Sequence, residues 1–174
     1  EQTHEIIEDV SHMKSELGIL YLSSRNREVI EKMLRQNELE FAPLFRAEPH
    51  VFLSSSHPLA DRSSVTLDDL QDYPYLSYEQ GEYNSFYFSE EILSTLDRAK
   101  NIRVRDRATL FNLVIGLDGY TVCSGVISAE LNGEGIVAVP LDVDEYMEIG
   151  IITRKNSQLT RYGETYVEAL RRHI

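Results

Sequence analysis

Cysteine, tryptophan and long apolar runs are scarce or missing in this sequence. Its 174 residues include one cysteine and no tryptophan. Because Cys123 stands alone, no internal disulfide forms, and a secreted disulfide scaffold is excluded. No stretch approaches the roughly 18 consecutive apolar residues of a membrane span. Residues 1–5 also lack the basic and then apolar order of a signal peptide, so we expect a cytoplasmic location.

Basic residues are also in short supply. The 17 lysines and arginines are outnumbered by 29 aspartates and glutamates, which gives a formal net charge of −12. This excess repels phosphate backbones and anionic headgroups, so we predict that the segment by itself binds neither nucleic acid nor membranes. Hydrophobic residues still make up 42% of the chain, enough for an ordinary core. The composition therefore indicates a globular domain.

Motifs for catalysis, cofactors and metals are absent too. The sequence has no Gly-x-Ser-x-Gly elbow, no Gly-x-Gly-x-x-Gly fingerprint and no phosphate loop. Its five histidines show no spacing typical of a tetrahedral zinc site. We therefore expect no catalytic residues, no cofactor and no metal.

What the sequence does contain is an alternation of helical and strand patterns. Apolar residues recur at helical spacing in residues 6–13, 29–34, 66–70, 88–96, 110–117, 126–131 and 159–170. Short apolar runs predict strands at residues 17–22, 41–45, 51–53, 75–78, 102–104, 120–123, 136–139 and 147–153. Pro43 predicts an edge strand, and Asp106 is placed to cap the helix that follows it.

This alternation predicts an α/β fold with mainly parallel sheets. The strands divide into two sets, which favours two lobes joined by two crossings near Ser77 and Leu141. We expect residues 1–76 and 142–174 to form the first lobe and residues 77–141 the second. In open α/β sheets ligands bind beyond the carboxyl ends of strands, so a small molecule is expected between such lobes.

The order of several segments resembles one known family. Residues 57–59, His-Pro-Leu, are followed by residues 66–70, Thr-Leu-Asp-Asp-Leu, and by 73–76, Tyr-Pro-Tyr-Leu; residues 16–19, Glu-Leu-Gly-Ile, precede them. Together these motifs resemble the effector-binding domain of LysR-type transcriptional regulators, which has a two-lobed, type 2 periplasmic-binding-protein-like architecture. The resemblance covers nearly the whole chain, but residues 117–119 and Ser124 depart from the family's usual pattern at one turn.

The resemblance implies a function and its partners. Such a domain senses a small-molecule effector and pairs with a second copy as a homodimer or within a tetramer. It reaches DNA only through an N-terminal winged helix-turn-helix, which is absent from this chain. The first lobe's opening strand, helix and strand are not visible ahead of Ile6, so we expect a truncated first lobe. Two alternatives stay open at this point: a solute-binding protein of a transporter and a small α/β enzyme.

Polar residues that follow the predicted strands are the candidate effector contacts. They are Ser23, Ser24, Tyr78, Glu79, Gln80, Gly81, Arg107, Thr109 and Ser124. Arg107 and Thr109 lie at a predicted helix N-terminus, whose unpaired amides suit an anionic group. The alternative is that Asp106 only caps the helix and Arg107 is solvated. Cys123 is interpreted as either an inert small residue or a redox sensor.

Overall fold

The protein forms two compact units. The computed structural model describes residues 2–81, 86–89, 91–128 and 133–172. Unit 1 comprises residues 1–46 and 147–174, and unit 2 comprises residues 47–146. The chain therefore enters and leaves unit 2 once each, as expected for two lobes joined by two crossings.

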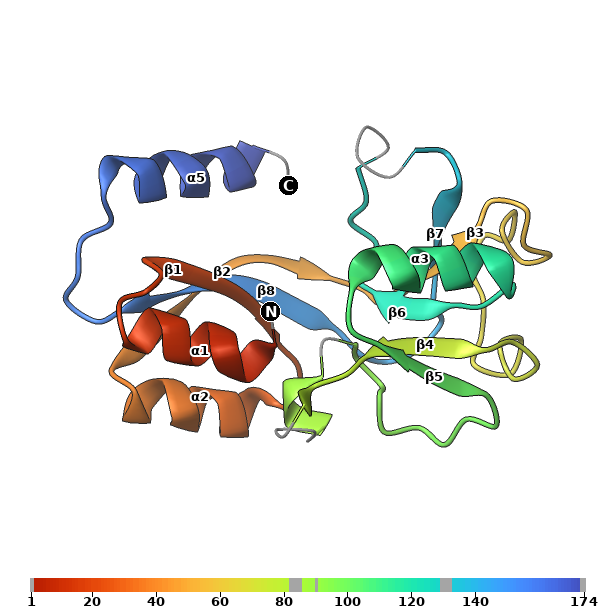
Figure 1. The fold of residues 1–174 in the computed structure, drawn as a ribbon, viewed down its shortest axis with the longest axis horizontal. Coiled ribbons are helices and arrows are strands. Elements are labelled where there is room, and N and C mark those ends of the chain that lie inside the picture. The colour runs from red at the N-terminus through yellow and green to blue at the C-terminus, as the bar shows by residue number, and fades with distance from the viewer. Residues whose placement is uncertain (1, 82–85, 90, 129–132, 173–174) are drawn as a thin grey trace. The chain divides into compact units, whose positions relative to one another are not determined.

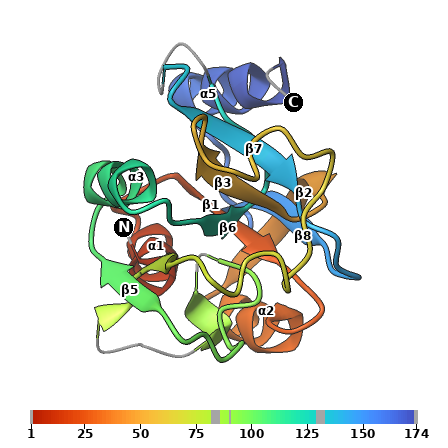
Figure 2. The same cartoon turned by 90° about the vertical axis from the view of Figure 1, so that its right-hand side faces the viewer.

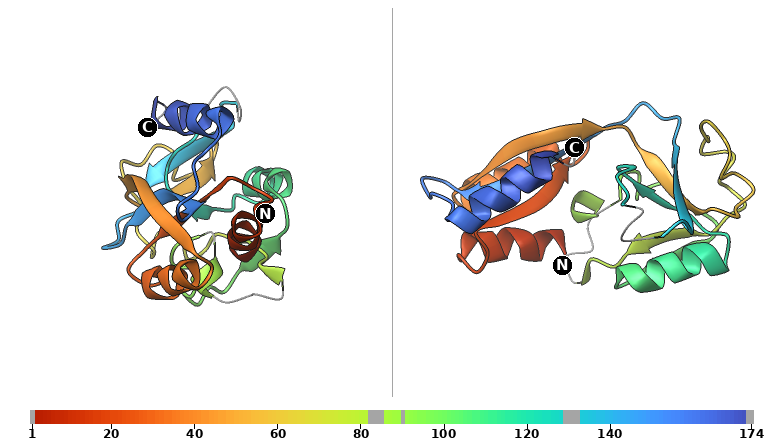
Figure 3. Two further views of the ribbon diagram at one scale, coloured as in Figure 1. Left: turned by 90° about the vertical axis from the view of Figure 1, so that its left-hand side faces the viewer. Right: turned by 90° about the horizontal axis from the view of Figure 1, so that it is seen from above.

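Unit 1 is a three-stranded sheet with helices on both faces (Figures 1 and 3). Its elements are α1 (Thr3–Ser11), β1 (Leu17–Leu22), α2 (Arg27–Gln36), β2 (Leu39–Ala47), β8 (Met147–Arg154) and α5 (Arg161–Arg172). The strand order is β1-β8-β2, and β1 and β8 are antiparallel. β2, which contains Pro43, lies at an edge, as predicted.

Alternation of side chains builds the core of unit 1. In β1, Gly18, Leu20 and Leu22 are buried on one face, while the intervening side chains are half-buried on the other. α1 buries Ile7 and Val10 against this sheet. A side chain at Gly18 would clash with Ile6, so glycine is required for this close approach of helix to strand.

In its described residues, unit 2 contains the remaining strands and the helix α3. Its elements are β3 (His50–Ser54), β4 (Tyr75–Tyr78), the 3-10 helix η2 (Phe86–Phe88), β5 (Asn101–Val104), α3 (Arg107–Gly116), β6 (Thr121–Cys123) and β7 (Ile136–Pro140). One sheet has the order β6-β3-β7 and the other pairs β4 with β5. α3 packs against β3, β4 and β5 (Figure 2), and its Leu110 and Val114 join Phe52 and Leu76 in the core.

Two expectations about topology need correction. β4 and β5 are parallel, but β1 with β8, β3 with β6, and β3 with β7 are antiparallel, so the sheets are not mainly parallel. These partners are distant in sequence and lack the direct helical crossover that makes neighbouring strands parallel. The division between units also falls after Arg46 and before Met147, rather than near Ser77 and Leu141, because β3 pairs with β6 and β7.

Two expected helices do not form. In its described part, the segment predicted as a helix over 88–96 contains turns and bends after η2. Leu93 has a left-handed backbone (φ 64°), and the Arg98 guanidinium takes the place of helical N–H donors by donating to the Leu93 and Leu96 carbonyl oxygens. Residues 66–70 form turns, although Thr66 and Asp69 make the reciprocal capping bonds. The helix expected over 126–131 lies partly outside the described residues.

Candidate functional site

The carboxyl end of β4 carries four of the candidate residues. The Glu79 N–H donates to the Val104 carbonyl oxygen at 2.8 Å, and its carboxylate pairs with Arg105 Nε at 2.7 Å. This hydrogen bond and charge hold the pKa of the Glu79 carboxyl below its usual range. Gln80 is buried, and Gly81 has φ +57°, a conformation that favours glycine. The loop after β4 is thus anchored to the end of β5.

The amino end of α3 is capped as the sequence predicts. The Asp106 carboxylate accepts hydrogen bonds from the Thr109 N–H at 2.8 Å and the Thr109 hydroxyl at 2.7 Å. These bonds, the backbone one first, lower the pKa of Asp106. The Arg107 guanidinium lies over the Phe111 ring, 4.8 Å from its centroid. Capping therefore accounts for Asp106, and an effector role for Arg107 and Thr109 stays a prediction.

Ser23 and Ser24 follow β1 and so belong to unit 1. The Ser23 N–H donates to Asn26 Oδ1 at 2.7 Å, and Asn26 Nδ2 donates to the Tyr21 carbonyl oxygen. Both Ser23 and Asn26 are buried. Asn26, which the sequence pattern does not single out, fixes with its side chain the turn that carries the two serines.

The end of β6 carries Cys123 and Ser124. The Ser124 hydroxyl accepts a 3.4 Å hydrogen bond from the Val126 N–H. The Cys123 thiol donates to the His50 carbonyl oxygen at 3.6 Å, and burial raises the pKa of this thiol to about 12. Because the thiolate is the reactive form, this raised pKa favours the interpretation of Cys123 as an inert small residue over that of a redox sensor.

Glu91 is a second residue that the sequence pattern missed. Its side chain is 3% exposed, and its Oε1 accepts the Tyr78 N–H at 2.8 Å. In the sequence Glu91 looks like an exposed position on the helix expected over 88–96. Unit 2 thus brings together Tyr78, Glu79, Glu91 and Arg105 at the carboxyl ends of β4 and β5. Among the described residues no cluster of three potential metal ligands occurs.

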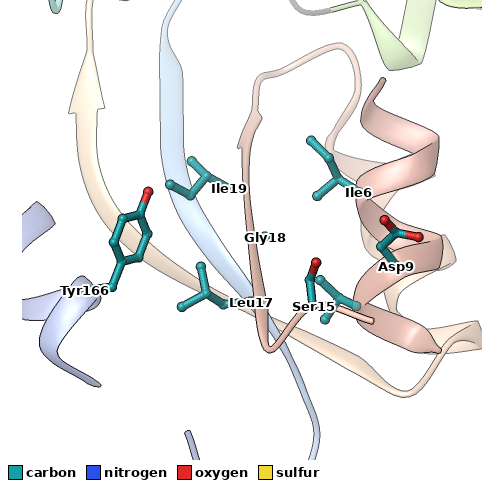
Figure 4. A pocket seen from close by; sticks show the side chains of 8 residues that line it. Ile6, Asp9, Ser15, Leu17, Gly18, Ile19 and Tyr166 are labelled. Carbon is teal, nitrogen blue, oxygen red and sulfur yellow. The ribbon is translucent and has the colours of Figure 1, made fainter. Parts of the chain in front are cut away.

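A separate pocket of about 480 Å³ lies in unit 1, along β1. Leu17 and Ile19 point from β1 toward Tyr166 of α5, while Ile6 and Asp9 project from α1 (Figure 4). None of the candidate effector contacts lines this pocket. Because β1 is the terminal strand of its sheet, the pocket follows a sheet edge.

The fold matches that of solved effector-binding domains, which belong to the class of type 2 periplasmic-binding-protein-like domains. Residues 1–174 match the family of the LysR substrate binding domain, and the chain belongs to this family. The resemblance found in the sequence is thereby confirmed. In the described part of the chain no helix is long and apolar enough to cross a bilayer.

Three relatives illustrate the match. The chain is 26% identical over 165 residues to the HTH-type transcriptional regulator CysL of Bacillus subtilis (strain 168), covering 91% of this chain and 46% of CysL. Oxidised OxyR is 25% identical, with a TM-score of 0.62 over 99% of this chain and 78% of that structure. The QuiR effector-binding domain in complex with shikimate is 19% identical, with a TM-score of 0.62 over 99% of this chain and 78% of that structure. The chain thus spans about half of CysL, and its relatives are transcriptional regulators rather than enzymes.

Proposed function

We propose that this chain is the effector-sensing and dimerisation domain of a cytoplasmic, LysR-type DNA-binding transcriptional regulator. The observation that carries the proposal is the family match over the whole chain. A structural relative, QuiR, binds shikimate in its effector-binding domain, which supports a small and anionic effector here. Effector binding shifts the balance between two arrangements of the domain, and the regulator's response follows that shift.

DNA contact is assigned to an N-terminal winged helix-turn-helix outside these 174 residues. The net charge of −12 supports this assignment, because it opposes binding to a phosphate backbone. We expect no gel shift of duplex DNA by this chain alone at moderate salt. A shift at moderate salt would contradict the assignment.

The effector contacts proposed are polar residues that follow strands. They are Ser23, Ser24, Tyr78, Glu79, Gln80, Gly81, Arg107, Thr109 and Ser124. Calorimetric titration with shikimate and a series of other small carboxylates tests the function. Saturable binding without turnover supports sensing, whereas chemical conversion of any of these compounds would indicate an enzyme. Absence of binding across the series would contradict the proposal that the effector is a small carboxylate.

The dimer is proposed to form along the open side of unit 1. Within the described residues β1 has a partner strand, β8, on one side alone, and the half-exposed Tyr166 of α5 lines the pocket along β1. A second copy of the chain would cover this apolar edge. Sedimentation at two salt concentrations tests this: association should strengthen with salt, because screening weakens repulsion between chains of charge −12. A monomer at physiological salt and micromolar concentration would rule out this dimer.

A further inference from the structure

β4 forms backbone hydrogen bonds on both of its sides near its amino end. The Tyr75 N–H donates to the Lys100 carbonyl oxygen on the β5 side at 2.9 Å. On the other side, the Leu76 N–H donates to the Tyr120 carbonyl oxygen at 2.8 Å, and the Tyr120 N–H to that of Pro74 at 2.9 Å. β4 therefore starts a parallel ladder with the segment that leads into β6.

This ladder stops where it would be expected to continue. Backbone groups two residues apart point to the same side of a strand, so the Tyr78 N–H faces the same side as that of Leu76. The next acceptor of a continued ladder would be the Val122 carbonyl oxygen, two residues after Tyr120. The Tyr78 N–H instead donates to Glu91 Oε1 at 2.8 Å. Over these fully described strands the parallel pairing ends at the Tyr75–Tyr120 bridge, and β4 and β6 lie in different sheets.

The chain places Glu91 there through a well-anchored irregular segment. Arg98 Nη1 donates to the Leu93 and Leu96 carbonyl oxygens, and its guanidinium lies 3.7 Å from the centroid of the Tyr75 ring. Arg98 Nε also donates to the Tyr120 hydroxyl at 3.1 Å. Arg98 thus fixes the segment of Leu93 and Leu96 next to Tyr75 and Tyr120, where β4 pairs with the chain that leads into β6. Burial of a carboxylate is costly, and Glu91 is only 3% exposed at the carboxyl end of β4, where the pairing with the β6 segment has stopped. This burial indicates a specific role for Glu91.

We propose that Glu91 is a positioning residue of the effector site. Its carboxylate takes the place of the Val122 carbonyl, stops the β4–β6 ladder after Leu76, and keeps the carboxyl ends of the two strands apart. Residues 78–81 follow β4 and Ser124 follows β6, and ligands of open α/β sheets bind beyond strand ends where neighbouring strands separate. Glu91 therefore orients residues 78–81 for the effector without contacting it. This inference rests on the proposed function.

Three substitutions test the role of Glu91. Glu91→Gln keeps an oxygen that accepts the Tyr78 N–H, Glu91→Asp withdraws the carboxylate by one methylene, and Glu91→Leu removes the acceptor. In Glu91→Asp and Glu91→Leu we expect a scalar coupling across a new hydrogen bond from the Tyr78 N–H to the Val122 carbonyl, measured by NMR. Shikimate should bind these two variants about tenfold or more weakly, whereas Glu91→Gln should stay within about twofold of the wild type.

The two measurements separate failure of this inference from failure of the proposed function. If neither Glu91→Asp nor Glu91→Leu pairs Tyr78 with Val122, the positioning role is overturned, whatever the affinity. If the pairing forms but the wild-type chain binds no carboxylate, the role in strand separation stands and the proposed effector class fails. Should Glu91→Leu not fold, Glu91→Asp decides the outcome, with β1–β8 amide exchange as the internal control for an intact unit 1.

Discussion

The two units differ in where they bury polar side chains. Unit 1 buries Ser23 and Asn26, which together form one turn. Unit 2 buries Ser54, His57, Ser77, Gln80, Glu91 and Thr121. Buried polar groups are costly unless they are paired, and they fix a particular arrangement when they are. Unit 2 is therefore built for a defined local geometry, whereas unit 1 combines an ordinary apolar core with an open sheet edge.

The largest expected difference between the units concerns two arginines. Arg98→Ala in unit 2 should lower the free energy of unfolding by about 3 kcal/mol, because it removes hydrogen bonds to the Leu93, Leu96 and Tyr120 oxygens and the stack on Tyr75. In unit 1, Arg27→Ala removes surface ion pairs to Glu31 and Glu148, and should cost about 1 kcal/mol or less. Urea denaturation of both variants measures the difference, and equal losses would contradict it.

A glycine in each unit provides the second test. Gly18→Ala should destabilise the protein by about 1 to 3 kcal/mol, because the added methyl group would clash with Ile6 where α1 meets β1. Gly116, at the end of α3, has open space around its Cα, so Gly116→Ala should be neutral or stabilise by up to about 1 kcal/mol. Thermal unfolding of both variants gives the comparison. Tolerance of Gly18→Ala would mean that α1 is not tightly packed on β1.

The elements that the sequence predicts correctly are those with local causes. β1 and β8 arise from short apolar runs, and α3 begins where Asp106 caps it. The segment over 88–96 has helical spacing but is not helical, because the Arg98 side chain supplies the donors that its carbonyl oxygens need. Glu91 was missed for the same reason: its partner, the Tyr78 N–H, is distant in sequence, and a periodic pattern contains no information about such a bond.

Acid should weaken unit 2 through His57. The Leu59 N–H donates to His57 Nδ1 at 3.1 Å, so Nε2 carries the proton and donates to the Asp118 carbonyl oxygen at 3.2 Å. The ring also packs on Tyr73, and burial lowers the pKa of His57 below its usual value near 6.5. The contribution of neutral His57 to the free energy of unfolding is therefore fully present above about pH 6.5. It is lost as the pH falls through the lower, folded-state pKa.

Urea titrations at pH 7.5 and 5.5 measure this loss. His57→Gln should reduce the decrease in unfolding free energy between the two pH values relative to the wild type. An unchanged decrease would mean that other groups account for the acid sensitivity. Leu59, Asp118 and Tyr73, which contact the His57 ring, all belong to unit 2, so the loss of stability should be confined to that unit.

The smallest effect on stability, but a specific effect on binding, is expected at the amino end of α3. Arg107 is exposed and lies over Phe111, and Thr109 donates its hydroxyl to Asp106, so Arg107→Ala and Thr109→Ala should change the melting temperature little. If an anionic effector binds here, Arg107→Ala should weaken shikimate or another carboxylate about tenfold, because it removes a charge-assisted hydrogen bond.

Arg35→Ala on α2 is the matched control, since it removes the same charge from an exposed helical position of unit 1. The affinity of Arg35→Ala for the carboxylate should equal that of the wild type if the effect at Arg107 is local. It should fall as much as that of Arg107→Ala if only the net charge of the chain matters. Raising the ionic strength separates these cases further, because screening weakens a long-range attraction more than a direct contact. Equal affinity of Arg107→Ala and Arg35→Ala would remove Arg107 from the site and leave Asp106 and Thr109 as a helix cap alone.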